Sequence, residues 1–307
     1  MSASRTCSTR ITRWCPTTRP PGVPITRGSV RASKLLPLAA ALSFGIGAAA
    51  ADGAGPARVV SLNVCTDQLA LLLAAPGQLV SVSPLGHDPR SSAMAEEAAA
   101  LPANAAHAEE IVLLEPDLVL AGTYTARAAV DMLERLGYRV ARFAPANSIE
   151  DARQNILQMG ALLGREPEAE TLLARFDNRL AALRDVPETR PLVAYYLPFN
   201  ETAGVQSLTG EILDTAGMAN ISEARGLPYG GRLPLEELVL AQPDLILVGQ
   251  PYDSPSQATA LLQHPVLRAT GALREIPDGQ NWICGTPFLL DAVEAMRELR
   301  RDWEAAQ

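Results

Sequence analysis

Cys65, His87 and Cys284 are the side chains of this 307-residue sequence whose types and positions suit nucleophilic or metal chemistry. Each lies at or just after the end of a segment that we expect to be a strand. A cysteine and a histidine on separate loops could act as nucleophile and base. The sequence has no Gly-x-Ser-x-Gly elbow, no Cys-x-x-Cys, and no Gly-x-Gly-x-x-Gly after the first expected strand. An exported Cys/His hydrolase is therefore the most remote hypothesis, and we expect no catalytic residues.

Cys65 and Cys284 also allow three structural roles, which the sequence leaves open. An even number of cysteines in an oxidising compartment suggests a disulfide. A disulfide needs the two Cα atoms within about 7 Å of each other. The alternatives are two thiolates that coordinate the metal of a ligand, and two inert buried thiols. We expect a disulfide or a close pair ahead of inert thiols, with coordination third.

A dedicated metal-ion site has little support in the sequence. Zinc sites usually gather three or four His, Cys or carboxylate ligands. His87, His107 and His264 are scattered, and only His87 is expected near a ligand. A zinc or manganese ion receptor is therefore the weaker alternative, and we expect no protein-bound metal and no cofactor.

Aromatic side chains gather in the loops that follow the expected strands. They are 5% of the chain, so their positions are informative. Rings with a polar tip suit a wet cleft lined by apolar surface, which favours a large, flat or ring-rich ligand. Arg232 offers a fork for an acidic group of that ligand. The predicted ligand-binding residues are Asn63, Cys65, His87, Tyr124, Tyr196, Phe199, Tyr229, Arg232, Tyr252, Trp282 and Cys284.

The elements that must position these residues alternate as strand and helix. Apolar runs over 58–63, 78–83 and 191–197 predict strands, and the longer patterns between such runs predict helices. Alternation of this kind is typical of parallel sheets, whose ligands lie beyond the carboxyl ends of the strands.

An internal repeat indicates two such units. Residues 109–122 and 236–249 share Glu-Glu, Pro-Asp and a following apolar run, at an offset of 127 residues. Each copy predicts a short helix, a turn and a buried strand. We therefore expect an α/β fold of two similar parallel-sheet lobes, joined by a long helical strut, with the ligand cleft between the lobes. The predicted boundaries are a leader over 1–51, an N-terminal lobe over 52–147, a helical linker over 148–187 and a C-terminal lobe over 188–307.

Residues 1–51 predict a cleaved signal peptide. They contain no acidic residue, six arginines and Lys34, followed by an apolar, alanine-rich run over 35–51. The segment is long for a signal peptide, so we expect an over-extended N-terminus and a true start near Val30. Cleavage removes seven positive charges and no negative ones, which changes the formal net charge from −8 to −15. We expect an exported, monomeric protein that is not inserted in the membrane after cleavage.

The scarcity of lysine argues against several other classes of protein. Lys34 is the single lysine, so the processed chain lacks the lysine that a P-loop or a Schiff base requires. No basic run follows Lys34, which argues against nucleic acid as a partner.

Over about residues 58–303 the sequence resembles the periplasmic substrate-binding proteins of the vitamin B12, ferric siderophore and haem importers. The resemblance rests on Arg-Val-Val-Ser-Leu-Asn at 58–63, on the repeated Leu-x-Pro-Asp-Leu-Val pattern, on the helical strut, and on the ending that starts at Trp282. It implies a periplasmic, non-catalytic binder that delivers a metal chelate to an ABC permease, with little closure of the lobes. Aromatic positions of the vitamin B12 binder match Tyr124, Phe199, Tyr229 and Trp282.

The sequence departs from the family at one place. The vitamin B12 binder contacts its permease through an acidic residue on the rim of each lobe. In this sequence Arg127 lies near the matching place in the first lobe. Glu96, Glu97 and Glu134 are the available substitutes. The sequence leaves open whether the ligand is a corrinoid, a haem or a ferric siderophore, and the scarcity of cations among the predicted site residues favours a corrinoid.

Overall fold

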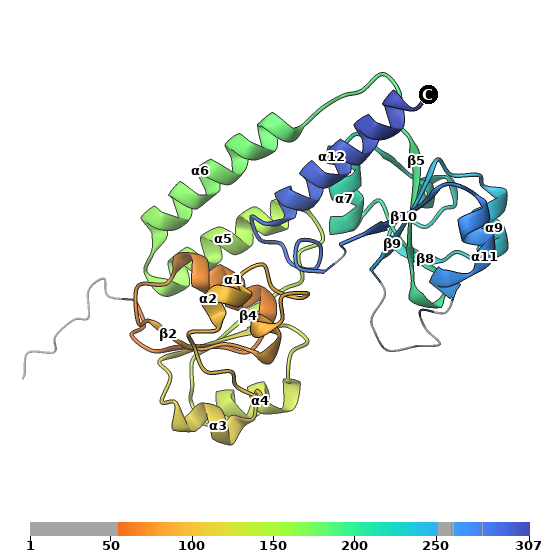
Figure 1. The fold of residues 1–307 in the computed structure, drawn as a ribbon. Helices are drawn as coiled ribbons and strands as arrows, with labels where there is room; N and C mark the ends of the chain where they lie inside the picture. The colour runs from red at the N-terminus through yellow and green to blue at the C-terminus, as the bar shows by residue number, and fades with distance from the viewer. Residues whose placement is uncertain (1–54, 251–258, 260, 278) are drawn as a thin grey trace, which may run out of the picture. The chain divides into compact units, whose positions relative to one another are not determined.

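A four-stranded parallel sheet forms the core of the first lobe in this computed structural model, which describes residues 55–250, 259, 261–277 and 279–307 (Figure 1). The strand order is β2 (Leu79–Ser81), β1 (Val59–Ser61), β3 (Leu118–Gly122) and β4 (Val140–Phe143). All three pairings are parallel, so the carboxyl ends of the strands share one edge. The described residues all belong to one compact unit, Ala51–Gln307. The predicted leader and its start lie outside the described residues.

Helices cover both faces of this first sheet, which explains its continuous apolar strands. One buried cluster joins the sheet to α1, and the other joins it to α3 and α4. The elements of this lobe are α1 (Val64–Leu73), η1 (Pro84–His87), α2 (Ala95–Ala98), α3 (Ala108–Leu113) and α4 (Arg127–Arg135).

The second lobe has a six-stranded sheet of order β10-β9-β5-β6-β8, with β7 paired to β5. The expectation of a purely parallel sheet needs correction here, because β6 and β8 pair antiparallel. Its strands are β5 (Leu192–Leu197), β6 (Glu201–Ala203), β7 (Ala219–Asn220), β8 (Gly230–Arg232), β9 (Leu245–Gly249) and β10 (Leu273–Ile276). Its helices are η2 (Pro198–Asn200), α7 (Leu208–Thr215), α8 (Ile221–Ala224), α9 (Leu235–Leu240), η3 (Leu261–Gln263), α11 (Pro265–Ala269) and α12 (Leu289–Ala305).

The two halves of the sequence repeat adopt matching local structures, as predicted. Each copy forms a short helix, α3 or α9, followed by a strand, β3 or β9. The residue before Pro-Asp is left-handed in both, with φ 46° at Glu115 and 47° at Gln242. The aspartate then holds the neighbouring strand: Asp117 accepts from the Arg58 N–H at 2.9 Å, and Asp244 accepts from the Leu192 N–H at 2.7 Å. The repeated Pro-Asp therefore fixes strand register.

The predicted strut consists of α5 (Ile149–Leu163) and α6 (Glu166–Leu183), which pack against each other (Figure 1). Ser148 caps α5 by accepting from the Asp151 N–H at 3.0 Å, as its capping-box sequence predicts. Residues Ile156 and Met159 of α5 belong to the core of the first lobe. Phe176 and Leu180 of α6 belong to the core of the second lobe. The strut is therefore shared between both cores.

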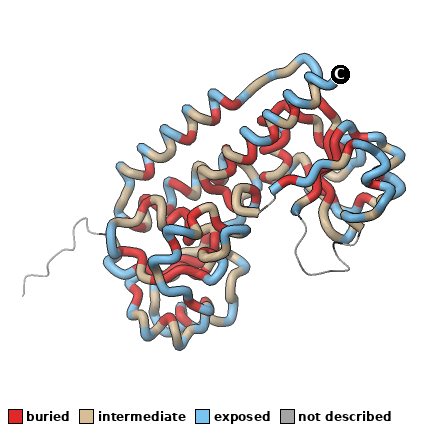
Figure 2. The backbone as a smooth tube through the Cα atoms, viewed as in Figure 1, coloured by how far each residue is buried: buried red, intermediate tan, exposed pale blue. Residues whose placement is uncertain are grey.

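Burial follows the strands and the inner faces of the helices (Figure 2). Among the described residues, no helix combines the length and the apolar character that a membrane span requires. The described part of the chain thus shows two α/β lobes with a helical connection, which confirms the predicted fold class.

Candidate ligand site

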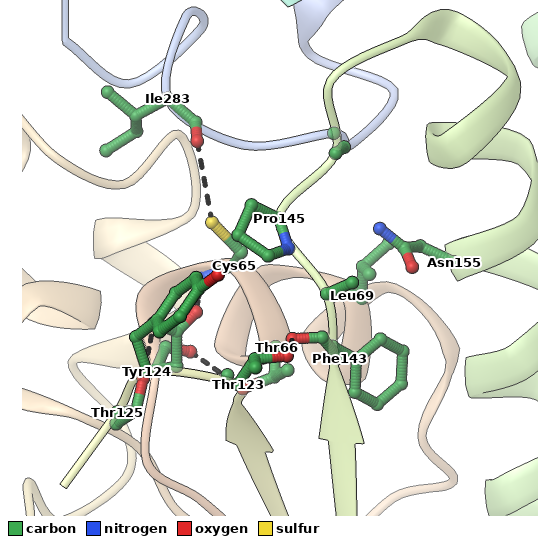
Figure 3. Close-up of a pocket in the computed structure, with 15 residues that line it drawn as sticks. Cys65, Thr66, Leu69, Thr123, Tyr124, Thr125, Phe143, Pro145, Asn155 and Ile283 are labelled. Atoms are coloured by element: carbon green, nitrogen blue, oxygen red, sulfur yellow. Dashed lines mark hydrogen bonds between the residues drawn. The ribbon is translucent and has the colours of Figure 1, made fainter. Parts of the chain in front are cut away.

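A cavity of about 130 Å³ lies at the carboxyl ends of β1, β3 and β4, which is the edge where the sequence predicts ligand binding (Figure 3). One wall comes from α1 and the loops that follow these strands. The opposite wall comes from the segment that precedes α12. The lining residues are Asn63, Cys65, Thr66, Leu69, Gly122, Thr123, Tyr124, Thr125, Phe143, Ala144, Pro145, Ala146, Asn155, Ile283 and Gly285.

Asn63 occupies the floor of this cavity and is held from two sides. Its Oδ1 accepts from the Cys65 N–H at 2.9 Å and thereby caps α1. Its Nδ2 donates to Thr125 Oγ1 at 3.1 Å. The amide orientation of Asn63 is therefore fixed, with one remaining N–H available for a ligand.

The three threonines of the lining differ in what they can offer. Thr66 Oγ1 donates to the Asn63 carbonyl oxygen at 2.9 Å, and Thr123 Oγ1 donates to the Phe143 carbonyl oxygen at 3.0 Å. Their hydroxyl hydrogens are thus used by the backbone. Thr125 accepts from Asn63, so its own hydroxyl hydrogen can point to a ligand. The Asn155 amide makes no hydrogen bond to other described residues.

No lining residue carries a charge. The polar groups are hydroxyls and amides, and the rest of the surface is apolar. Tyr124 adds a ring that is 73% exposed. An arrangement of this kind can donate and accept neutral hydrogen bonds and can pack against a ring, and it offers no counter-ion for an ionised group.

A disulfide closes one side of the cavity. Of the three roles left open for the cysteines, the structure contains the disulfide: Cys65 and Cys284 are bonded, with Cα atoms 5.2 Å apart. Cys65 is half-buried and lines the cavity, whereas Cys284 is 1% exposed. The Cys65 sulfur also lies 3.7 Å from the Ile283 carbonyl oxygen (Figure 3). The bond joins two segments 219 residues apart at the edge of the site.

A buried carboxyl group supports the helix that carries this wall. Asp67, in α1, is fully buried and accepts from the backbone N–H of Ser83 at 3.1 Å and from its hydroxyl. Burial raises the pKa of Asp67 to about 6, against the opposing effect of hydrogen bonds from Ser61 and Ser83 and of the nearby His87. Asp67 therefore ties α1 to the loop that follows β2.

Two of the predicted ring positions are buried, and as ligand contacts they stay predictions. Tyr196 is 0% exposed, and its hydroxyl donates to Asn200 Oδ1 at 2.7 Å. Trp282 is 5% exposed, and its ring centroid lies 5.2 Å from that of Tyr195. Adjacent residues of a strand point to opposite faces, and both faces of this sheet are covered, so Tyr195 and Tyr196 are both buried. Neither Tyr196 nor Trp282 presents a ring face to the cavity.

The remaining predicted residues differ in whether they line the cavity. Asn63, Cys65 and Tyr124 line the cavity. His87 does not line it, and its Nε2 lies 3.1 Å from the Leu101 carbonyl oxygen. Exposed side chains of the second lobe, which do not line the cavity either, stay predictions as ligand contacts: Phe199, Tyr229 and Arg232. Tyr252 lies outside the described residues.

Sequence reasoning missed the part of the lining that follows β4 and the part contributed by the strut. Phe143, Pro145 and Asn155 belong to these parts. Val-Ala-Arg-Phe at 140–143, which forms a further strand of the parallel sheet, could have indicated the part that follows β4. Ile283 was also missed, although it lies between the predicted Trp282 and Cys284.

The described residues hold no cluster of three or more His, Cys, Asp or Glu side chains that could bind a metal ion. The raised pKa of Tyr196, about 12, follows from burial and from the nearby negative charge of Glu236. Tyr196 is therefore protonated near neutral pH.

Comparisons with known proteins agree with this fold. A cobalamin-binding protein of Halobacterium salinarum is 31% identical over 225 residues, which cover 71% of this chain and 61% of that protein. The chain thus spans about three fifths of the length of this curated relative. A periplasmic haem-binding protein from Roseiflexus sp. RS-1 superimposes with a TM-score of 0.63 at 22% identity, covering 83% of this chain and 100% of that one. The vitamin B12-binding protein of Vibrio cholerae gives a TM-score of 0.61 at 20% identity, covering 81% and 98%.

The sequence model of the periplasmic binding protein family matches residues 59–276. This match runs from the first strand of the first lobe to the last strand of the second, and it includes both copies of the repeat. The chain therefore belongs to the periplasmic binding protein family.

Proposed function

We propose that this protein is the substrate-binding component of an ABC importer, which captures a metal chelate in the periplasm and delivers it to an inner-membrane permease. The observation that carries the proposal is the uncharged cavity at the carboxyl ends of β1, β3 and β4, with Tyr124 exposed at its side. The cobalamin-binding relative and the family membership support it.

The size of the cavity limits what it can hold. Pockets that enclose a drug-sized molecule usually measure about 300–1,000 Å³. This cavity measures about 130 Å³, so it accepts one edge of a larger ligand. The remainder of the ligand lies outside it, where the Tyr124 ring offers a stacking surface.

The chemistry of the lining favours a corrinoid over the other chelates. The edge of a corrin ring carries carboxamides, which donate and accept hydrogen bonds as Asn63, Thr125 and Asn155 do. Haem carries carboxylates, and many siderophores are acidic. Burying an ionised group against a lining without a cation is costly. We therefore place cobalamin or another corrinoid first among the ligand classes.

The permease contact is expected on the rims of the lobes. Arg127 is exposed at the start of α4, near the place that matches an acidic rim residue of the vitamin B12 binder. Glu134 already pairs with Arg142 at 3.0 Å, which leaves Glu96 and Glu97 of α2 as the exposed acidic candidates. In the proposed function the protein acts as a monomer, needs no cofactor and has no catalytic role.

Isothermal titration with cyanocobalamin, haemin and ferrioxamine tests the choice of ligand. The proposal predicts saturable one-to-one binding of cyanocobalamin at sub-micromolar affinity, and binding of the other two at least about tenfold weaker, which corresponds to 1.4 kcal/mol. Tighter binding of haemin would contradict the argument from the uncharged lining. Absence of binding to all three would contradict the metal-chelate proposal itself.

A further inference from the structure

The disulfide joins Cys65, which lines the cavity, to Cys284, which is buried beside it. Cys65 is the second residue of α1, directly after the first sheet. Cys284 lies in the irregular segment between β10 and α12, after the last strand of the second sheet rather than at its end, where the sequence places it. The bond therefore connects the carboxyl-end segments of the two sheets at the place where a ligand is expected.

The segment around Cys284 is anchored on both sides of the disulfide. A side chain at Gly279 would come within 1.8 Å of the Arg90 carbonyl oxygen, and one at Gly285 within 2.3 Å of the Ala146 Cβ. With its side-chain amide turned so that the nitrogen donates, Gln280 hydrogen-bonds the Pro89 carbonyl oxygen at 2.7 Å. Between these anchors Ile283 is half exposed and lines the cavity. These contacts hold the segment to the residues before α2 and after β4, whereas its covalent connection to α1 is the disulfide beside Ile283.

The two sulfur atoms differ in access. Cys284 is 1% exposed, whereas Cys65 is half-buried and lines the cavity. A thiolate that approaches through the cavity therefore meets Cys65 before Cys284. A ligand edge in the cavity would occupy the same space. Reduction of the disulfide and ligand binding should therefore exclude each other.

We propose that the Cys65–Cys284 disulfide is a redox latch of the ligand site, which a dithiol reductant opens through the cavity. The inference rests on the proposed function only for the identity of the ligand. One thiolate of the reductant attacks Cys65 Sγ, the S–S bond breaks, and the electron pair leaves on Cys284 Sγ, which takes up a proton. The second thiolate of the reductant then displaces Cys65, which leaves as a thiol, and the reductant becomes a disulfide. Reduction frees the Ile283 wall from α1 and weakens ligand binding.

The experiment measures the rate of reduction by dithiothreitol under native conditions, with alkylation and mass spectrometry of the peptides that contain Cys65 and Cys284. Ala144→Trp narrows the cavity at an exposed position, and Ala161→Trp places the same ring on the exposed side of α5 as a matched control. The latch predicts about tenfold slower reduction in Ala144→Trp only, because access to the attacked sulfur governs the rate. Equal rates in both variants and the unmodified protein would overturn it.

Two further measurements identify the attacked sulfur and show whether reduction loosens the segment around Ile283. With glutathione, which cannot complete the second step within one molecule, the mixed disulfide should form on Cys65, and modification of Cys284 instead would overturn the proposal. After reduction, hydrogen exchange should increase over 281–286 and stay unchanged in α6. Unchanged exchange over 281–286 would show that the disulfide does not hold the wall.

Cyanocobalamin as an added probe separates the two proposals. If it slows reduction as Ala144→Trp does, and reduced protein binds it about tenfold more weakly, the latch and the ligand are both supported. If Ala144→Trp slows reduction and cyanocobalamin does not, the latch stands and the corrinoid proposal fails. If Ala144→Trp has no effect, the latch fails whatever the protein binds.

Discussion

Asn63 and Thr125 meet on the floor of the cavity, where Asn63 Nδ2 donates to Thr125 Oγ1 at 3.1 Å. The contact joins the end of β1 to the loop after β3. The same Asn63 side chain caps α1 through the Cys65 N–H. One amide therefore stabilises a helix, bridges two strand ends and presents a donor to the site.

Replacing Asn63 by alanine should reduce both stability and affinity. Loss of the cap is expected to cost about 1 kcal/mol of unfolding free energy, and loss of the fixed donor should weaken ligand binding. Asn220 is a matched control, because its Oδ1 caps α8 in the same way at 2.9 Å and it does not line the cavity. Urea unfolding and calorimetry of both variants check this. An equal loss of affinity in Asn220→Ala would refute a specific role for Asn63.

Tyr124→Ala should weaken ligand binding by about 1–3 kcal/mol, as expected for an aromatic anchor. Its ring is 73% exposed, so the unfolding free energy should change little. Leu113→Ala removes a comparably exposed apolar side chain from the end of α3, which does not line the cavity, and it should leave affinity unchanged. Unaltered binding in Tyr124→Ala would remove the ring from the site.

Asp67 should make stability depend on pH between about 4 and 6. Burial raises its pKa from 3.8 to about 6, so the folded protein binds this proton more tightly than the unfolded chain does. The resulting contribution is fully present below about pH 4 and is lost as the pH rises through 6, with a size of about 3 kcal/mol.

Asp67→Asn isolates this effect from other groups, including the nearby His87, because only the difference between the two pH profiles is used. Chemical unfolding at a series of pH values should show a steeper fall in stability from pH 4 to 6 for the unmodified protein than for the variant. Parallel profiles would show that Asp67 does not titrate in this range.

Packing rather than ion pairing should hold α6 to the second lobe. Phe176 is buried in that core, and its replacement by alanine should cost about 3–5 kcal/mol of unfolding free energy. Arg179 pairs with Asp291 at 2.6 Å, but both side chains are about 40% exposed. Arg179→Ala should therefore cost less than about 1 kcal/mol, and the cost should shrink in salt. The opposite ranking in urea unfolding would contradict this account.

The repeat, the strut and the caps could be predicted because local sequence determines them. Pro-Asp after an apolar helix, and Ser148 before Asp151, specify turns and helix starts with few alternatives. The exposure of rings at strand ends could not be predicted in the same way. Tyr196 is buried because helices cover both faces of the second sheet. Trp282 is buried because the segment between β10 and α12 places its ring beside Tyr195. Both depend on contacts between distant segments.

From the sequence, the disulfide was one of three possible roles for the two cysteines. The sequence could not decide between them, because no local pattern fixes the distance between Cα atoms separated by 219 residues. The cavity edge was identified correctly, since parallel strands bring their carboxyl ends together. Its lining was incomplete, because Asn155 comes from the strut and Ile283 from the segment before α12. These contributions follow from how the elements pack.

Calorimetric titration of the Ala144→Trp variant with cyanocobalamin shows whether the cavity beside the disulfide receives the ligand. We expect saturable one-to-one binding by the unmodified protein and by Ala161→Trp, and an affinity at least about tenfold lower in Ala144→Trp, a difference of 1.4 kcal/mol. Equal affinity in all three proteins would contradict this expectation and place the ligand elsewhere on the molecule.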